Sequence, residues 1–316
     1  MDASALSLTE RPALGGRSND WLFVTAAETK GWILDAICRE IGARTQGTWD
    51  VAYGPKIIPK AGAYFFSHYL LWLDNLKRNP HLEGARSLVW MTHPRSSRYS
   101  DAELVAGLGK AKHVVFACSS FRDFMLARGL SAAQSSVVLG AADPAMFLPH
   151  QRTGGGAVGF SSAYYERKGP DIILDLVRMA PHRRFILVGR GWEAYPRFPE
   201  LSAAPNFQYL TASFREYPAI YAQMDVFVSP ALLEGGPIPL METMMCNVVP
   251  VASCTGFAPD IIRRGENGFL FEIGAPASDI LPLIEQAFLL GADVRATVQA
   301  YSWDAFARRI IALAEG

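Results

Sequence analysis

Apolar and polar positions follow two patterns that alternate along this chain. Short apolar runs, such as residues 21–25 and 185–188, are typical of strands that are buried on both faces. Between such runs lie segments with apolar residues at helical spacing, for example residues 32–41 and 171–179. Strands that alternate with helices predict an α/β fold built on doubly wound sheets.

The predicted strands fall into two groups that are separated by a glycine-rich segment, residues 149–156 (PHQRTGGG). The first group covers residues 21–25, 63–66, 87–91, 114–118 and 137–139, and the second covers residues 157–160, 185–188, 207–210, 226–229 and 248–252. We therefore expect two Rossmann-like domains, residues 21–150 and 151–300, which face each other across a cleft at the carboxyl ends of their strands. Residues 1–20 are polar and are expected to form a flexible tail.

Composition and charge exclude few classes of function. The chain has 316 residues, half of them apolar, so it is long enough to bury two modest cores. Its 30 basic and 30 acidic residues cancel, which gives no reason to expect nucleic acid or an anionic membrane as an obligatory partner. Its four cysteines lack metal-ligand spacing and are interpreted as free buried thiols. With no signal-like or membrane-spanning apolar run, these thiols favour a cytoplasmic location, and peripheral membrane contact stays open.

The most informative segment is residues 232–253, LLEGGPIPLMETMMCNVVPVAS. It places Glu234 and Glu242 on either side of a predicted helix start, because proline suits the first turn of a helix. The turn itself is built from Gly235, Gly236, Pro237 and Ile238. Exposed N–H groups and the positive end of the helix dipole attract phosphate at such a start. The segment predicts an anion cradle bordered by carboxylates, which suits a sugar nucleotide.

This segment resembles the Glu-x7-Glu signature of retaining glycosyltransferases with the two-Rossmann GT-B fold, the family 4-like "glycosyl transferases group 1". The apolar runs on both sides, residues 226–228 and 248–252, strengthen the resemblance. It implies a UDP- or GDP-type sugar donor, a hydroxyl acceptor on a polysaccharide, glycolipid or natural product, retention of configuration, and no metal or cofactor. It also implies that Glu234 lies at the donor sugar, as a catalytic residue, and that Glu242 lies at the ribose.

Residues 165–174, YERKGPDIIL, resemble the Lys-Gly turn of the same family, whose lysine pairs with the donor diphosphate. Lys168 takes that position, and a lysine at a helix start is physically suited to the role. One departure is clear: the arginine that the family has after the preceding strand is missing from residues 159–162, Gly-Phe-Ser-Ser. Arg167 and Arg190 are the candidates to replace it.

The end of two further strands supplies the remaining donor-side candidates. Gly189 and Arg190 belong to a Gly-x-Gly turn, which lets backbone approach a ligand or a neighbouring helix. Tyr209 and Leu210 fall where the family reads the nucleobase edge with its backbone. Backbone contacts leave little trace in a sequence, so uridine and guanosine are not distinguished.

In the first half, His93 follows the strand 87–91 and resembles the family histidine that lies beside the transferred sugar. His68 competes with it at a similar strand end, and a structural histidine is the alternative for both. Lys30 and Gly31 are acceptor-side candidates in the first strand-to-helix loop. Arg95 is another candidate, although a plain solvated loop fits it equally well.

The last helix, within residues 301–316, resembles the family's closing segment, which crosses back to the first domain; an ordinary amphipathic helix is the alternative.

Two other functions also fit the sequence. A catalytically silent sugar-nucleotide-binding partner of the same fold would explain the missing arginine and the short first half, and a GT-B epimerase would also use the cleft. The sequence leaves the nucleotide, the sugar, the acceptor and the oligomeric state open.

Overall fold

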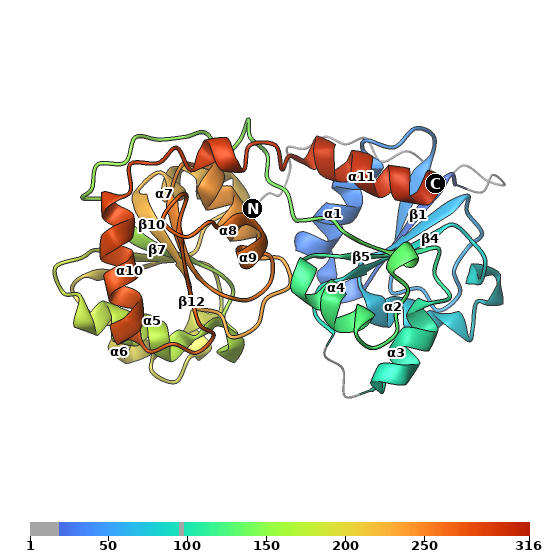
Figure 1. Cartoon of the computed structure of the whole chain (residues 1–316), viewed down its shortest axis with the longest axis horizontal. Helices are drawn as coiled ribbons and strands as arrows, with labels where there is room; N and C mark the ends of the chain where they lie inside the picture. The colour runs from blue at the N-terminus through green and yellow to red at the C-terminus, as the bar shows by residue number, and fades with distance from the viewer. Residues whose placement is uncertain (1–18, 95–97) are drawn as a thin grey trace.

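The computed structural model describes residues 19–94 and 98–316, which form two α/β domains side by side (Figure 1). The predicted tail of residues 1–20 lies almost wholly outside the described residues, and Arg95 lies outside them as well. Each domain contains a six-stranded sheet in which all strand pairs are parallel. The predicted α/β, two-Rossmann fold is therefore confirmed.

The first sheet has the strand order β2-β1-β3-β4-β5-β6. Its strands are β1 (Trp21–Thr25), β2 (Trp49–Tyr53), β3 (Ala63–Phe66), β4 (Ser87–Met91), β5 (His113–Phe116) and β6 (Ser135–Val137). The helices of this domain are α1 (Ile33–Gly42), α2 (Tyr69–Leu76), α3 (Asp101–Leu108) and α4 (Ser119–Leu126). Strand order reverses between β1 and β3, so the loops after these two strands lie at the topological switch point of the sheet.

The second sheet has the strand order β12-β11-β10-β7-β8-β9, which reverses between β7 and β10. Its strands are β7 (Ala157–Ser161), β8 (Phe185–Val188), β9 (Phe207–Leu210), β10 (Met224–Ser229), β11 (Val249–Ser253) and β12 (Phe269–Phe271). Its helices are α5 (Pro170–Met179), α6 (Phe198–Ser202), α7 (Tyr217–Tyr221), α8 (Ile238–Met245), α9 (Ala258–Ile261) and α10 (Ala277–Leu289). Doubly wound sheets bind ligands at such a reversal.

Short 3-10 turns complete the loops of both domains. They are η1 (Ala27–Thr29), η2 (Pro80–Leu82), η3 (Ala132–Gln134), η4 (Glu166–Lys168), η5 (Trp192–Ala194), η6 (Phe214–Glu216) and η7 (Arg295–Thr297). Among the described residues, no helix combines the length and the apolar character that crossing a bilayer requires. Of the cysteines, Cys38, Cys118 and Cys246 are buried free thiols, whereas Cys254 is only half-buried.

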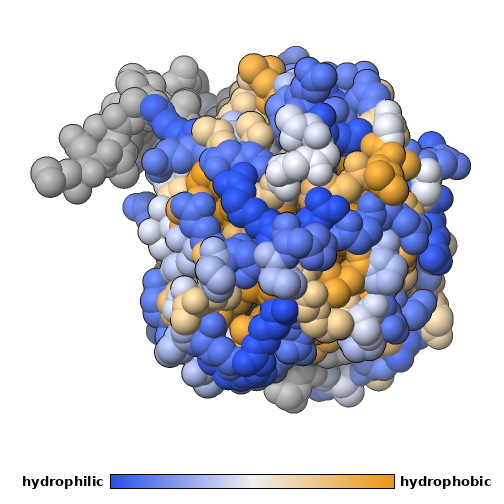
Figure 2. All heavy atoms as spheres, turned by 90° about the vertical axis from the view of Figure 1, so that its left-hand side faces the viewer, coloured by the Kyte–Doolittle hydropathy of each residue, from blue (hydrophilic) through white to orange (hydrophobic). Residues whose placement is uncertain are grey.

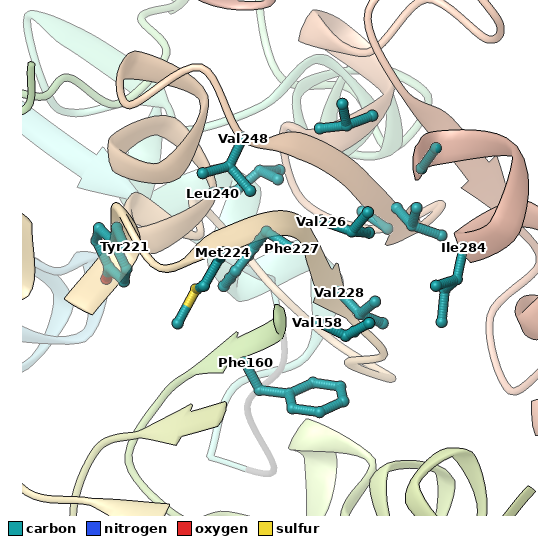
Figure 3. Close-up of a cluster of buried hydrophobic side chains, with 14 of the residues drawn as sticks. Val158, Phe160, Tyr221, Met224, Val226, Phe227, Val228, Leu240, Val248 and Ile284 are labelled. Atoms are coloured by element: carbon teal, nitrogen blue, oxygen red, sulfur yellow. The ribbon is translucent and has the colours of Figure 1, made fainter. Parts of the chain in front are cut away.

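The core of the second domain explains the position of α8. Val226 and Val228 of β10 are almost completely buried, and Leu240 of α8 packs into the same cluster (Figure 3). Because α8 is held on the sheet through such side chains, its first turn is fixed near the carboxyl end of β10. The outer face of this domain is mostly hydrophilic with scattered apolar residues (Figure 2), as expected when the apolar positions point inward.

The last helix, α11 (Trp303–Glu315), lies on the first domain although it follows the second one in sequence (Figure 1). Its Phe306 and Ile310 are buried in the core of the first domain, and the Phe306 ring lies 5.4 Å from that of Trp90. The Ala142 N–H also donates to the carbonyl of Tyr301 (3.1 Å). The chain thus connects the two domains at residues 149–156 and again before α11.

Candidate functional site

A small pocket of about 20 Å³ lies where the order of the second sheet reverses, at the carboxyl ends of β7 and β10. Polar lining comes from Ser161, Ser162, Lys168 and Glu234, and Pro237 closes it at the start of α8. The Lys168 ammonium and the Glu234 carboxylate, both in its lining, pair with each other. This site therefore joins the two sequence motifs that are about 66 positions apart.

Glu234 is 7% exposed and accepts hydrogen bonds from two cations. Its carboxylate pairs with the Lys168 ammonium and, at 3.4 Å, with Nη1 of Arg167. Arg167 also donates to the Leu233 carbonyl (2.7 Å), and the Glu234 N–H donates to Oγ1 of Thr255 (3.1 Å). The buried carboxylate is thus compensated, and two positive groups are held at one point of the pocket.

Gly169 explains why Lys168 reaches Glu234. Its φ of +70° lies in the left-handed region, and a Cβ at this position would lie 2.4 Å from the Pro230 carbonyl oxygen. Only glycine fits both conditions. The η4–α5 turn can therefore lie directly against the loop after β10, which places Lys168 beside Glu234.

The turn before α8 contacts the first domain. A Cβ on Gly235 would lie 2.6 Å from Cβ and 2.7 Å from the carbonyl oxygen of Thr92, so backbone approaches backbone across the cleft. Gly236 is also close, with its Cβ position 3.5 Å from that of Ala117. Pro237 is the N-cap of α8, Ile238 begins the helix, and no side chain caps this start. The turn that leads into α8 therefore lies beside Thr92 at the end of β4.

His68 and His93 lie at the ends of β3 and β4 with their ring centroids 6.5 Å apart. Nδ1 of His68 accepts a hydrogen bond from the Leu70 N–H (3.2 Å), so the proton of the neutral ring is on Nε2. Burial and the neighbouring His93 lower the pKa of His68 to about 4. His68 is therefore a neutral imidazole near pH 7. His93 is within hydrogen-bond distance of Oγ1 of Thr92 (3.0 Å).

The remaining acceptor-side candidates lie at the end of β1. The Lys30 ammonium is 5.4 Å from the centre of the Tyr53 ring, and the Gly31 N–H donates to the buried Asp35 carboxylate (2.8 Å). Trp32, the next residue, faces the second domain, where the Arg190 guanidinium lies 3.1 Å from its ring centre. Arg190 thus contacts the first domain across the cleft.

The other donor-side candidates lie at the ends of β8 and β9. A Cβ on Gly189 would lie 1.8 Å from the Ser162 carbonyl oxygen, so this glycine permits close contact within the protein itself. The Tyr209 hydroxyl donates to the Gly189 carbonyl (3.4 Å), and the Gly189 N–H donates to Leu210 (3.0 Å). Gly189 therefore lies against Ser162 of the pocket lining, and Tyr209 and Leu210 lie next to Gly189. A nucleobase contact at Tyr209 and Leu210 stays a prediction.

Glu242 lies deeper than Glu234. It is 4% exposed and accepts a hydrogen bond from the Tyr221 hydroxyl (3.2 Å), which is also 2.9 Å from Oγ of Ser161. Burial raises the pKa of Glu242 to about 8. Its direct contact with a ribose stays a prediction, because Tyr221 is its partner here. Tyr221 and Ser161 were not among the predicted site residues, since a tyrosine in a helix pattern carries no functional signal.

The raised pKa of Glu242 makes stability depend on pH. The folded protein binds this proton up to about pH 8, whereas an unfolded carboxyl loses it near its ordinary pKa of 4.5. The stabilising contribution is therefore complete below about pH 4.5 and is lost as pH rises through about 8. We therefore compare the free energy of unfolding of Glu242→Gln with that of the original chain. Between mildly acidic and alkaline pH, this difference should shift in favour of the variant by at least about 1 kcal/mol, roughly 2–4 °C in melting temperature.

Thermal melts of both proteins across this pH range check the expectation. Glu272→Gln provides the matched control, because Glu272 is an exposed glutamate of the same domain. A difference between Glu242→Gln and the original chain that stays constant with pH would contradict the raised pKa.

Comparisons with known proteins agree with this geometry. Residues 155–286, most of the second domain, match the family described as "Glycosyl transferases group 1". An uncharacterised glycosyltransferase of Methanocaldococcus jannaschii is 26% identical over 155 residues, 46% of this chain. That match spans 44% of the relative, less than half of its length.

Two solved structures share the fold of the whole chain. HepE of Anabaena, in complex with UDP and glucose, superposes with a TM-score of 0.73 at 14% identity, over 92% of this chain and 98% of that one. Sucrose-phosphate synthase of Thermosynechococcus elongatus has a TM-score of 0.73 at 16% identity, over 95% of this chain and 98% of that one. Residues 155–286 thus match the glycosyl transferases group 1 family, and the two domains together have the GT-B fold.

Proposed function

We propose that the protein is a retaining glycosyltransferase that moves a sugar from a nucleotide-diphosphate donor to a hydroxyl acceptor without a metal or cofactor. The observation that carries the proposal is the convergence of Lys168, Arg167 and Glu234 at the start of α8. The family match of the second domain and the UDP and glucose bound to HepE support it.

The donor diphosphate is expected to lie between Lys168 and the first turn of α8. Pro237 has no N–H, so the amide donors of this turn are those of Gly235, Gly236 and Ile238. Negative charge that develops on the departing diphosphate would be stabilised by these amides together with Lys168. Arg167, which already touches Glu234, is the better placed substitute for the missing arginine, whereas Arg190 lies against Trp32.

Binding of the diphosphate would exchange one ion pair for another. The Lys168 ammonium now pairs with Glu234. A phosphate that draws this ammonium away leaves the Glu234 carboxylate to accept hydrogen bonds from donor-sugar hydroxyls and to stabilise developing positive charge on the sugar. In the front-face route that the resemblance favours, the leaving phosphate takes the acceptor proton, so Glu234 is not a nucleophile.

The first domain supplies the acceptor side of the reaction. His93 lies next to Thr92, which touches Gly235, so its imidazole is close to the place where sugar and acceptor meet. His68, Lys30 and Gly31 lie at the reversal of the first sheet and are proposed to bind the acceptor. We further propose that the acceptor is a polysaccharide, a glycolipid or a natural product, and that the protein works in the cytoplasm.

Thermal melts with UDP, GDP and ADP test the donor site. A nucleotide that binds only the folded protein stabilises it by about 2.7 kcal/mol at a hundred times its Kd, and we expect one of the three to do so selectively. Loss of the shift in Lys168→Ala would place the nucleotide at this pocket. No shift with any of the three would contradict the proposal.

A catalytically silent sugar-nucleotide-binding protein is the second candidate, because Ser161 and Ser162 stand where the family has its arginine. Donor sugars of the nucleotide that binds, incubated with hydroxyl acceptors or with water alone, separate the two functions. Transfer or slow hydrolysis supports the enzyme. Tight donor binding without release of sugar, over a broad acceptor panel, supports the silent protein.

A further inference from the structure

Arg190 and Trp32 form a contact between the two domains. The Arg190 guanidinium, in the loop after β8, lies 3.1 Å from the ring centre of Trp32, which is the N-cap of α1. Both side chains are exposed, Trp32 by 40%, so neither belongs to a packed core. The negative face of an indole ring attracts such a cation. The pair therefore joins the domains through a contact that can open without disturbing either core.

The side chain of Arg190 starts beside the donor pocket. A Cβ on the preceding Gly189 would lie 1.8 Å from the carbonyl oxygen of Ser162, which lines the pocket. The Arg190 carbonyl accepts a hydrogen bond from the Tyr164 N–H (2.9 Å), so its backbone is held against the loop after β7. From this fixed position at the edge of the pocket, the side chain reaches the first domain.

Trp32 also has a fixed backbone. The Gly31 N–H donates to the buried carboxylate of Asp35 (2.8 Å). The same carboxylate accepts hydrogen bonds from the Tyr53 hydroxyl (2.6 Å) and from Nε of Arg39 (3.1 Å). Because solvent competes little for bonds to a buried carboxylate, the turn before α1 is firmly held. This turn presents the Trp32 ring to the second domain.

Two contacts between the domains border the proposed site. Thr92, after β4, lies against Gly235, which follows β10. Trp32, after β1, lies against Arg190, which follows β8. The first sheet places β3 between β1 and β4, and the second places β7 between β8 and β10. The loops after β3 and β7 carry an acceptor-side histidine and the pocket lysine, so the site has one contact on each side.

The contact at Trp32 is the outer one of the two. Residues 149–156 follow β6, and the segment before α11 is bonded to Ala142, also after β6. The domains are thus connected from the β6 edge of the first sheet, and β4 lies nearer to this edge than β1 does. A hinge-like opening about these connections therefore separates Trp32 from Arg190 furthest.

We propose that Arg190 and Trp32 form a clasp that shuts the cleft over a bound donor and opens to release the nucleotide. This inference rests on the proposed function, because it needs a nucleotide in the cleft. Arg190 is then a positioning residue that acts on the donor through Trp32 and does not bind the phosphates. A shut cleft keeps water from the reacting sugar and retains the donor until the acceptor binds.

Nucleotide release, followed by stopped flow, tests the clasp with a fluorescent derivative of whichever of UDP, GDP and ADP binds best. A cation–π contact at an exposed site changes an equilibrium by about twofold to fivefold, so Trp32→Ala and Arg190→Ala should each speed release by about that factor. The combined variant should release no faster than either single one, because both remove the same contact. A direct contact between Arg190 and the nucleotide would instead make Arg190→Ala alone effective, which would overturn the clasp.

Two variants are matched controls for the loss of a side chain. Ile33→Ala changes the next residue, which is 42% exposed and therefore comparable with Trp32. Arg263→Ala removes an exposed arginine of the second domain. Both should release the nucleotide at the original rate. Trp32→Phe keeps an aromatic face that attracts a cation less strongly than indole does, so its release rate should lie between those of the original chain and Trp32→Ala.

Release at the original rate in Trp32→Ala, or additive effects in the combined variant, would overturn the clasp and leave the proposed function intact. If none of the three diphosphates binds, the proposed function fails, and small-angle scattering of the free protein still decides the clasp. Trp32→Ala and Arg190→Ala should then have a larger radius of gyration than the original chain and the two controls. An unchanged radius in both would overturn the clasp as well.

Discussion

Replacing Gly235 with alanine is expected to reduce sugar transfer by about a hundredfold, the loss that a misplacement of about 1 Å between reacting groups can cause. The added Cβ would lie 2.6–2.8 Å from Cβ, O and C of Thr92. Two of these atoms belong to the backbone, so a rotamer change cannot relieve the contact. The two domains must therefore move apart at the point where donor and acceptor groups meet.

Rates of transfer or of donor hydrolysis measure this effect, and small-angle scattering measures the separation of the domains. Gly291→Ala is the matched control, because a Cβ there meets no atom within 4 Å. It should leave both measurements as they are in the original chain. A Gly235→Ala protein that works at the original rate would show that the contact between Thr92 and Gly235 does not belong to the reacting arrangement.

Replacing Lys168 with alanine is expected to lower transfer at least about tenfold, roughly 1.4 kcal/mol of barrier. The variant loses the ammonium that would meet the diphosphate. It also leaves the buried Glu234 with Arg167 as its remaining cation among its described partners. An unbalanced carboxylate next to the phosphates would repel the donor, so we expect weaker nucleotide binding together with slower turnover.

Kinetics with the nucleotide sugar that binds give both quantities. Lys168→Arg keeps the charge but changes the shape, so its loss should be smaller than that of Lys168→Ala. Lys60→Ala removes an exposed lysine of the first domain and controls for the change in net charge. Equal turnover and binding in Lys168→Ala and Lys60→Ala would remove Lys168 from the site.

Buried strands were predictable because their side chains are apolar on both faces. The runs at β1, β3, β4 and β8 coincide with the predicted ranges, and so does the half-buried edge strand β9. The edge strand β2 was missed, because its sequence WDVAY is exposed or half-buried and lacks a continuous apolar run. Strand β12 was missed for a related reason, since it has only three residues. The first strand-like run after α4 was predicted at 137–139, whereas β6 pairs through Ser135–Val137.

The site was predictable where its residues lie close together in the sequence. Glu234, the turn that follows it and Lys168 belong to two compact motifs, and the structure brings them together. Long-range contacts left no such trace. The approach of Gly235 to Thr92 and the bond between Tyr221 and Glu242 depend on how separate elements pack, which neither composition nor spacing records.

The most direct measurement is a crystal structure of the protein with UDP, or with GDP or ADP if one of these binds more tightly. We expect the diphosphate to lie between the Lys168 ammonium and the amides of Gly235, Gly236 and Ile238, with the Glu234 carboxylate released toward the sugar position. A diphosphate bound away from the start of α8, with the pair between Lys168 and Glu234 intact, would contradict it.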